Sequence, residues 1–176
     1  MENLINENDL IYLCEHNSKV LRNEKNSLIS PDKIASILDT IVQNKKIKVK
    51  AKIIKLMRAL LRYQHNPKNV KLFSNYWDPT NIHRAESLKE NRVFIENIRT
   101  QLDLEFRNSK TLYLYILDNL EDIYNLCVIL ESEDNKISPD CYEKKLPFSL
   151  ENILKKEYYP EYKDFQDSLY DEVLIK

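Results

Sequence analysis

The sequence predicts an all-α protein, and three observations support this prediction. The chain of 176 residues contains no glycine, which supplies most left-handed backbone positions in tight hairpins and bulges. Apolar residues recur at the three- and four-residue spacing of amphipathic helices. Cap-and-proline pairs, which are typical of helix starts, stand at Ser30-Pro31, Asn66-Pro67, Asp78-Pro79 and Ser138-Pro139. We therefore expect seven to nine helices in a single compact domain.

Three helices are predicted in the first 65 residues. The second begins at Ser30-Pro31 and ends near Asn44, and a basic amphipathic helix follows it and ends at His65. Pro67 cannot continue that helix, because proline lacks the N–H and clashes with the preceding turn. The first helix spans 9–23, and its apolar side carries Leu10, Leu13, Cys14 and Leu21.

Further helices are predicted in the second part of the chain. Short helices cover 66–77 and 79–88, and a longer one covers 91–107. The most apolar helix, 110–130, begins after the capping residue Ser109 and is expected to lie centrally, because it is apolar over most of its circumference. Since glycine is missing, we expect asparagine at left-handed positions at helix ends.

The charge pattern divides the chain into two parts. From Tyr113 to the end there are fifteen Asp and Glu against seven Lys, although the whole chain has a net charge of only −1. We expect a helical core domain, 1–135, and an acidic, tyrosine-rich segment, 136–176, packed on it. With 176 residues, the core is large enough to fold without metal or disulfides.

The basic helix carries the candidate binding site. Between Thr40 and Trp77 there are ten basic residues and no acidic one. At about 100° per residue, six of the cations fall on one side of the helix and the apolar residues mostly on the other. We call these six the basic stripe; they are Lys45, Lys48, Lys52, Lys55, Arg58 and Arg62.

Several interpretations of this stripe are open. Its cations could be solvated or could pair with the acidic C-terminal part within the fold, and such surface pairs contribute only about 0–1 kcal/mol each. The functional hypothesis is a non-enzymatic interaction or adaptor domain that binds a protein with an acidic surface. The alternative is nucleic-acid binding through the same stripe, which would weaken steeply with salt. The candidate partner-binding residues are Lys48, Lys52, Lys55, Arg58, Arg62 and Trp77.

Other classes of function lack their motifs. Without glycine, the chain cannot contain a P-loop, a dinucleotide fingerprint or a nucleophile elbow. The three cysteines and three histidines show no metal-ligand spacing, so we expect no metal, no cofactor and no catalysis. We expect no membrane association and a cytoplasmic or nuclear location, because no signal peptide or uninterrupted apolar span is visible. The abundance of Asn, Ile, Lys and Tyr suggests an AT-rich genome.

Residues 51–73 resemble the last helix of an armadillo repeat running into the next repeat. The resemblance rests on a small residue, an apolar helix and an Asn-Pro-x-Asn turn, carried by Ala51, Leu56, Ala59, Leu60, Asn66, Pro67 and Asn69. It implies armadillo/HEAT-like stacking, whereas the absence of a recurring period of about 40 residues favours an irregular helical bundle. Size and helix count are also similar to those of small viral Bcl-2-like inhibitors of host signalling, although Trp77 is followed by Asp78-Pro79 rather than by that family's motif.

Overall fold

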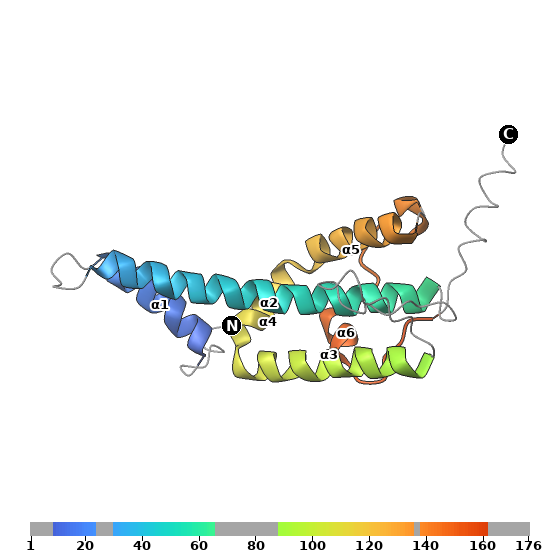
Figure 1. Cartoon of the computed structure of the whole chain (residues 1–176), viewed down its shortest axis with the longest axis horizontal. Coiled ribbons are helices and arrows are strands. Elements are labelled where there is room, and N and C mark those ends of the chain that lie inside the picture. The colour runs from blue at the N-terminus through green and yellow to red at the C-terminus, as the bar shows by residue number, and fades with distance from the viewer. Residues whose placement is uncertain (1–8, 24–29, 66–87, 136–137, 162–176) are drawn as a thin grey trace, which may run out of the picture.

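The computed structural model describes residues 9–23, 30–65, 88–135 and 138–161, and all regular structure in these ranges is helical. This confirms the predicted all-α class. The described part contains six α-helices and one 3-10 turn (Figure 1). They are α1 (Leu10–Asn23), α2 (Pro31–His65), α3 (Leu88–Asn108), α4 (Lys110–Asp118), α5 (Leu120–Asn135), η1 (Pro139–Cys141) and α6 (Leu150–Leu154). The predicted short helix over 66–77, and with it Trp77, lies outside the described residues, and so does the predicted helix over 79–88 except for Leu88, where α3 begins.

Helix α2 is the spine of the domain. It runs without interruption for 35 residues, or about 52 Å, from Pro31 to His65. The predicted end near Asn44 is therefore wrong: neither proline nor glycine stands there, and Val42 and Val49 on either side are both buried in the core. The segment that resembles an armadillo repeat lies on this long helix as far as His65, and its Asn-Pro-x-Asn turn lies outside the described residues.

The other helices pack around α2. Helix α1 runs beside its N-terminal half, and α3 and α5 lie on opposite sides of its C-terminal half (Figure 1). As predicted, the apolar side of the basic segment faces the interior, and Ile53, Leu56 and Leu60 are fully buried. Burial of each such side chain stabilises the fold by roughly 1.5–3 kcal/mol.

The predicted helix 110–130 is in fact two helices that meet at Asn119. This residue has φ −108° and ψ 10°, and its side-chain amide donates to the carbonyl of Tyr115 at 2.7 Å. A side chain that bonds to the preceding turn in this way competes with the helical backbone pattern. The chain changes direction here, and α5 then lies along the C-terminal half of α2 (Figure 1).

The segment after α5 contributes to the same core. Tyr142, Phe148, Leu150 and Ile153 are buried in one cluster with the side chains of the long helices. Arg99 of α3 is also buried, and its guanidinium donates to the carbonyl of Ile153 at 2.8 Å. Residues 138–161 are therefore attached to the helices by both apolar and polar contacts, whereas 162–176 lie outside the described residues.

The predicted apolar side of α1 is confirmed at Cys14, but it is wrong at Leu10 and Leu13, which are exposed. The structure buries Ile11, Cys14 and Ser18, whereas Leu10 is 65% exposed. The buried side also includes a polar contact that the periodicity of apolar residues does not reveal. The Ser18 hydroxyl lies 2.5 Å from the Asp39 carboxylate of α2, and this contact turns Ser18 inward.

A buried carboxylate connects the starts of α1 and α4. Asp9 accepts hydrogen bonds from the backbone N–H of Ile11 and Tyr12, and also from the Ser109 hydroxyl and the Thr111 N–H. Ser109 caps α4, as predicted, by accepting from Leu112 N. Burial alone raises the pKa of Asp9, but hydrogen bonds from Thr111, Ser109 and Tyr12 outweigh it, and the pKa lies below its ordinary value of 3.8.

We predict that Asp9→Ala lowers the free energy of unfolding by about 1–2 kcal/mol, because two helix starts lose their acceptor. A lowered pKa in the folded state means that the stabilisation is present above the ordinary value and is lost as the pH falls through the folded-state pKa. Urea unfolding at pH 7 and at pH 3 measures this difference. Ser149→Ala, which removes the cap of the short helix α6 only, is the control. An Asp9→Ala effect that does not shrink in acid would contradict the prediction.

Candidate functional site

The structure places the six cations of the basic stripe in different surroundings. Lys48 is exposed, Lys45, Lys52, Lys55 and Arg62 are partly buried, and Arg58 is only 2% exposed. The prediction that Arg58 lies on an outer rim is therefore wrong. The C-terminal half of α2 has neighbours on opposite sides, so residues on the polar flank of the helix become buried as well.

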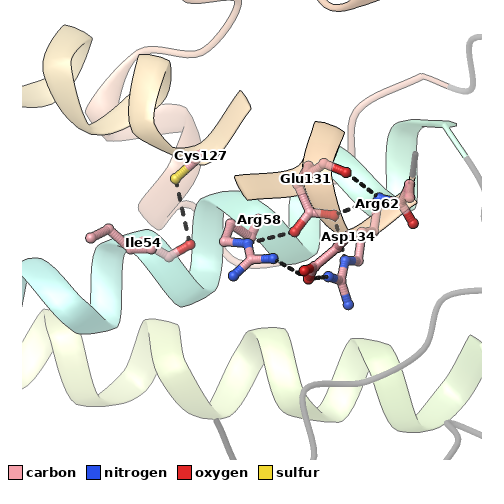
Figure 2. Close-up of polar contacts among 7 residues, drawn as sticks. Ile54, Arg58, Arg62, Cys127, Glu131 and Asp134 are labelled. Carbon is pink, nitrogen blue, oxygen red and sulfur yellow. Dashed lines mark hydrogen bonds and ion pairs between the residues drawn. The ribbon is translucent and has the colours of Figure 1, made fainter. Parts of the chain in front are cut away.

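Arg58 and Arg62 bind two acidic residues of α5 (Figure 2). The Arg58 and Arg62 Nε atoms donate to the two oxygens of the Glu131 carboxylate, each at 2.5 Å. Both guanidinium groups also donate to Asp134 Oδ2, at 2.6 and 2.9 Å. We call these four residues the arginine–carboxylate cluster. One of the predicted alternatives, pairing of the basic helix with acidic residues within the fold, accounts for both arginines.

Burial makes this cluster costly to break. Glu131 is fully buried, so its charge is tolerated only because two guanidinium groups and the Asn135 side-chain amide bind it. Burial lowers the pKa of Arg58, but the coulombic attraction and hydrogen bond of Glu131 outweigh this, and its pKa is raised. The cluster therefore attaches α5 to α2, and its donors and acceptors are committed to one another.

We predict that Glu131→Ala lowers the free energy of unfolding by about 3–5 kcal/mol, because two arginines, one of them buried, lose their shared carboxylate. Asp134→Ala is the matched control: this side chain is 53% exposed, and its loss should cost about 0–1 kcal/mol. Urea unfolding of both variants at one pH measures the difference. Equal effects would contradict the assignment of Glu131 as the main contact between α2 and α5.

The thiol beside the cluster shows no sign of reactivity. Cys127 of α5 is fully buried, and its sulfur lies 3.8 Å from the carbonyl oxygen of Ile54, to which it donates (Figure 2). Burial raises the pKa of Cys127 to about 12. A nucleophilic cysteine needs the opposite, a lowered pKa and access to solvent, so this thiol is a core residue.

Two further lysines of the stripe are also paired. Lys45 and Lys52 bind Glu105 of α3, with Nζ–Oε distances of 2.6 and 3.4 Å. Burial raises the pKa of Glu105, but its contacts with Lys45 and Lys52 outweigh this, and the net shift is downward. Four of the six stripe cations are thus compensated by carboxylates within the fold.

An open pocket of about 430 Å³ lies where α1, α2, α3 and α4 meet. We call it the basic pocket. Its walls combine apolar side chains with two lysines, one glutamate and two asparagines; the lining residues are Leu10, Ile11, Ile41, Asn44, Lys45, Lys48, Glu105, Asn108, Ser109 and Leu112. Of the predicted partner-binding residues, the pocket includes Lys48, whereas Lys52, Lys55, Arg58 and Arg62 are not among its lining residues.

Lys48 is the distinctive residue of this pocket. It is exposed, and within the described ranges it has neither a hydrogen bond nor an ion pair. Lys45, by contrast, is bound to Glu105. Leu10 and Ile41 leave 65% and 46% of their surface exposed beside this free cation. The arrangement suits a ligand that carries both a negative charge and apolar groups.

Sequence reasoning missed the acidic partners of the stripe. Glu105, Glu131 and Asp134 are not among the site residues predicted from the sequence. The spacing of Glu131 and Asp134 could have pointed to both of them. Arg58 and Arg62 are four residues apart on one helix, and Glu131 and Asp134 are three apart on another, so each pair lies on one helix face. Matched charge pairs at such spacing are candidates for contact between helices.

No group of three or more histidine, cysteine, aspartate or glutamate side chains in the described ranges is arranged to hold a metal ion. Nor does any described helix have the length and apolar character needed to cross a membrane. The fold and site together define an all-α domain built around one long helix, with the basic pocket at the place where four of its helices meet. The chain belongs to the family called Domain of unknown function DUF29, whose model matches residues 5–159. No curated protein and no solved structure matched the chain.

Proposed function

We propose that this domain works by binding a partner protein with an acidic surface, without chemistry of its own, and that the basic pocket is the docking site. The observation that carries the proposal is Lys48, an exposed cation without a partner in the described part of the chain, next to the exposed apolar side chains of Leu10 and Ile41. A carboxylate of the partner neutralises Lys48, and a neighbouring apolar side chain covers Leu10 and Ile41.

A protein partner is favoured over nucleic acid because most cations of the basic stripe are already paired with carboxylates of the fold. Phosphate binding through the stripe needs a row of available lysines and arginines. Lys45, Lys52, Arg58 and Arg62 each bind a carboxylate of the fold, so the stripe offers little uncompensated charge. A pocket with apolar walls and one lysine that has no ion pair within the described ranges is typical of protein or small-molecule recognition rather than of backbone phosphate binding.

We also propose that the domain works in a reducing compartment, the cytoplasm or the nucleus. The three cysteines are free, and Cys14 and Cys127 are buried in the core as thiols. Nothing in the fold favours the armadillo/HEAT or Bcl-2-like resemblance over an irregular bundle, and both resemblances stay predictions.

Photocrosslinking in the native cell tests the proposed function. A photoreactive amino acid at Leu10 should capture a protein, whereas the same amino acid at Val93, an exposed apolar position on α3 outside the pocket, should not. The captured protein is then purified and its binding to the full chain is measured by calorimetry. Absence of a crosslink from Leu10, or equal crosslinking from both positions, would contradict the docking site.

We predict that Lys48→Glu weakens binding of that partner about tenfold or more, because the substitution places a negative charge against the partner's carboxylate. Lys33→Glu is the matched control, since Lys33 is an exposed lysine on the same helix outside the pocket. Calorimetry at low and high salt should show the wild-type affinity falling with salt. Unchanged affinity in Lys48→Glu would contradict the role of this lysine.

A further inference from the structure

A second surface of the domain has the opposite charge. From Thr111 to Asn135 the chain contains six carboxylates and no lysine, arginine or histidine. Glu131 and Asp134 bind the arginines of α2. The other four are exposed and, within the described ranges, have no hydrogen bond or ion pair; they are Asp118, Glu121, Asp122 and Glu133.

Apolar side chains lie between these acids on α5. Leu126 and Ile129 are 38% and 50% exposed, and Asp122 and Glu133 stand on either side of them in the sequence. The successive spacings of four, three and four residues place all four side chains on one face of the helix. We call this row of Asp122, Leu126, Ile129 and Glu133 the α5 outer stripe. It is about 16 Å long.

The α5 outer stripe does not face the core. The inner side of α5 already supplies Ile123, Tyr124 and Cys127 to the interior. In Figure 1, α5 lies on the side of α2 opposite to α3, which contributes Glu105 to the basic pocket. Single exposed leucines are normal on protein surfaces, but here two exposed aliphatic side chains stand three residues apart on one helix face, between two exposed carboxylates.

We propose that the α5 outer stripe is a docking surface for a basic amphipathic helix of a second partner protein. Charge complementarity selects the occupant: the stripe carries a carboxylate at each end and two aliphatic side chains between them. A partner helix with two cations eleven residues apart and apolar residues at the intervening helical positions meets all four groups. The two arginines of α2 that reach α5 are bound to Glu131 and Asp134, so they do not neutralise the stripe, and we expect its cations to come from a partner.

The proposal goes beyond the proposed function, because surface, partner charge and residues all differ from those of the basic pocket. A domain that binds an acidic partner at the pocket and a basic helix at α5 joins two proteins. The carboxylates of α5 repel the acidic partner, and Lys48 repels the basic helix. The two surfaces therefore do not compete for one ligand.

Peptide display tests the proposal on the full chain. The probe is a phage library of helical peptides of about 16 residues, which are long enough to span the stripe. We expect enrichment of peptides with lysine or arginine eleven residues apart and aliphatic residues between them. Absence of enriched peptides, or enrichment without this cationic spacing, overturns the proposal.

Fluorescence polarisation with the most enriched peptide then locates its binding site. Leu126→Ala/Ile129→Ala and Asp122→Lys/Glu133→Lys should each weaken binding about tenfold or more. The matched controls are Val93→Ala and Glu151→Lys, an exposed aliphatic residue and an exposed carboxylate elsewhere, and both should bind as the wild type does. Lys48→Glu should also leave peptide binding intact. Wild-type binding by both stripe variants overturns the proposal.

Analytical ultracentrifugation distinguishes two possible occupants of the stripe, a second copy of this chain and a basic helix of another protein. If the free chain forms a dimer that Leu126→Ala/Ile129→Ala abolishes, the stripe is covered by a second copy and the proposal fails. A monomeric chain that binds the cationic peptide supports it. Circular dichroism and urea unfolding verify that the variants fold, which we expect because all four side chains are exposed.

Discussion

The architecture depends on compensation of the charge that α2 carries. A helix that carries eight basic residues and no acidic one from Lys45 to Arg62 repels itself unless carboxylates come close. The structure supplies them from three directions: Glu15 of α1 binds Lys46, Glu105 of α3 binds Lys45 and Lys52, and Glu131 of α5 binds both arginines. Helices α1, α3 and α5 thus each bring both apolar surface and a carboxylate to α2. Hydrophobic burial stabilises the packing, and the ion pairs determine which helix lies where along α2.

A chain without glycine also has to turn by other means. Asn119 interrupts the long apolar segment with a side-chain bond to the preceding turn. Asp9 and Ser109, which are hydrogen-bonded to each other, cap the starts of α1 and α4 at one point. The left-handed position after α6 is taken by Glu157, with φ 59°, and not by the asparagine that we expected. That conformation costs roughly 1–2 kcal/mol for a residue with a Cβ. The Glu157 N–H donates to the Glu96 carboxylate at 3.1 Å, a contact between distant segments that local sequence preference does not reveal.

The features that could be predicted from the sequence are those that depend on residues close together in the chain. The helical class, the cap at Ser109 and the buried face at Ile53, Leu56 and Leu60 depend on local spacing, and the structure confirms them. The burial of Arg58 depends on where α5 lies, which in turn depends on the break at Asn119. A helical projection assigns one buried side to a helix, but α2 is covered from opposite sides. Of the candidate partner-binding residues, only Lys48 lines the basic pocket, and Trp77 lies outside the described residues.

The ion pairs within the fold also determine which charged side chains stay unpaired on the surface. Among the groups that have no ion pair in the described ranges, Lys48 lies beside exposed aliphatic residues at the basic pocket, and Asp122 and Glu133 lie beside others on α5. A charge that has no partner within the fold contributes little to stability when it is exposed. An exposed aliphatic side chain is hydrated at a free-energy cost that folding does not recover. An exposed charge and exposed aliphatic side chains occur together at both places. Binding of a complementary protein would pair the charge and remove the aliphatic surface from water. The net charge of −1 does not reveal that unpaired positive and negative charges lie on different surfaces, because charges of opposite sign cancel in the sum.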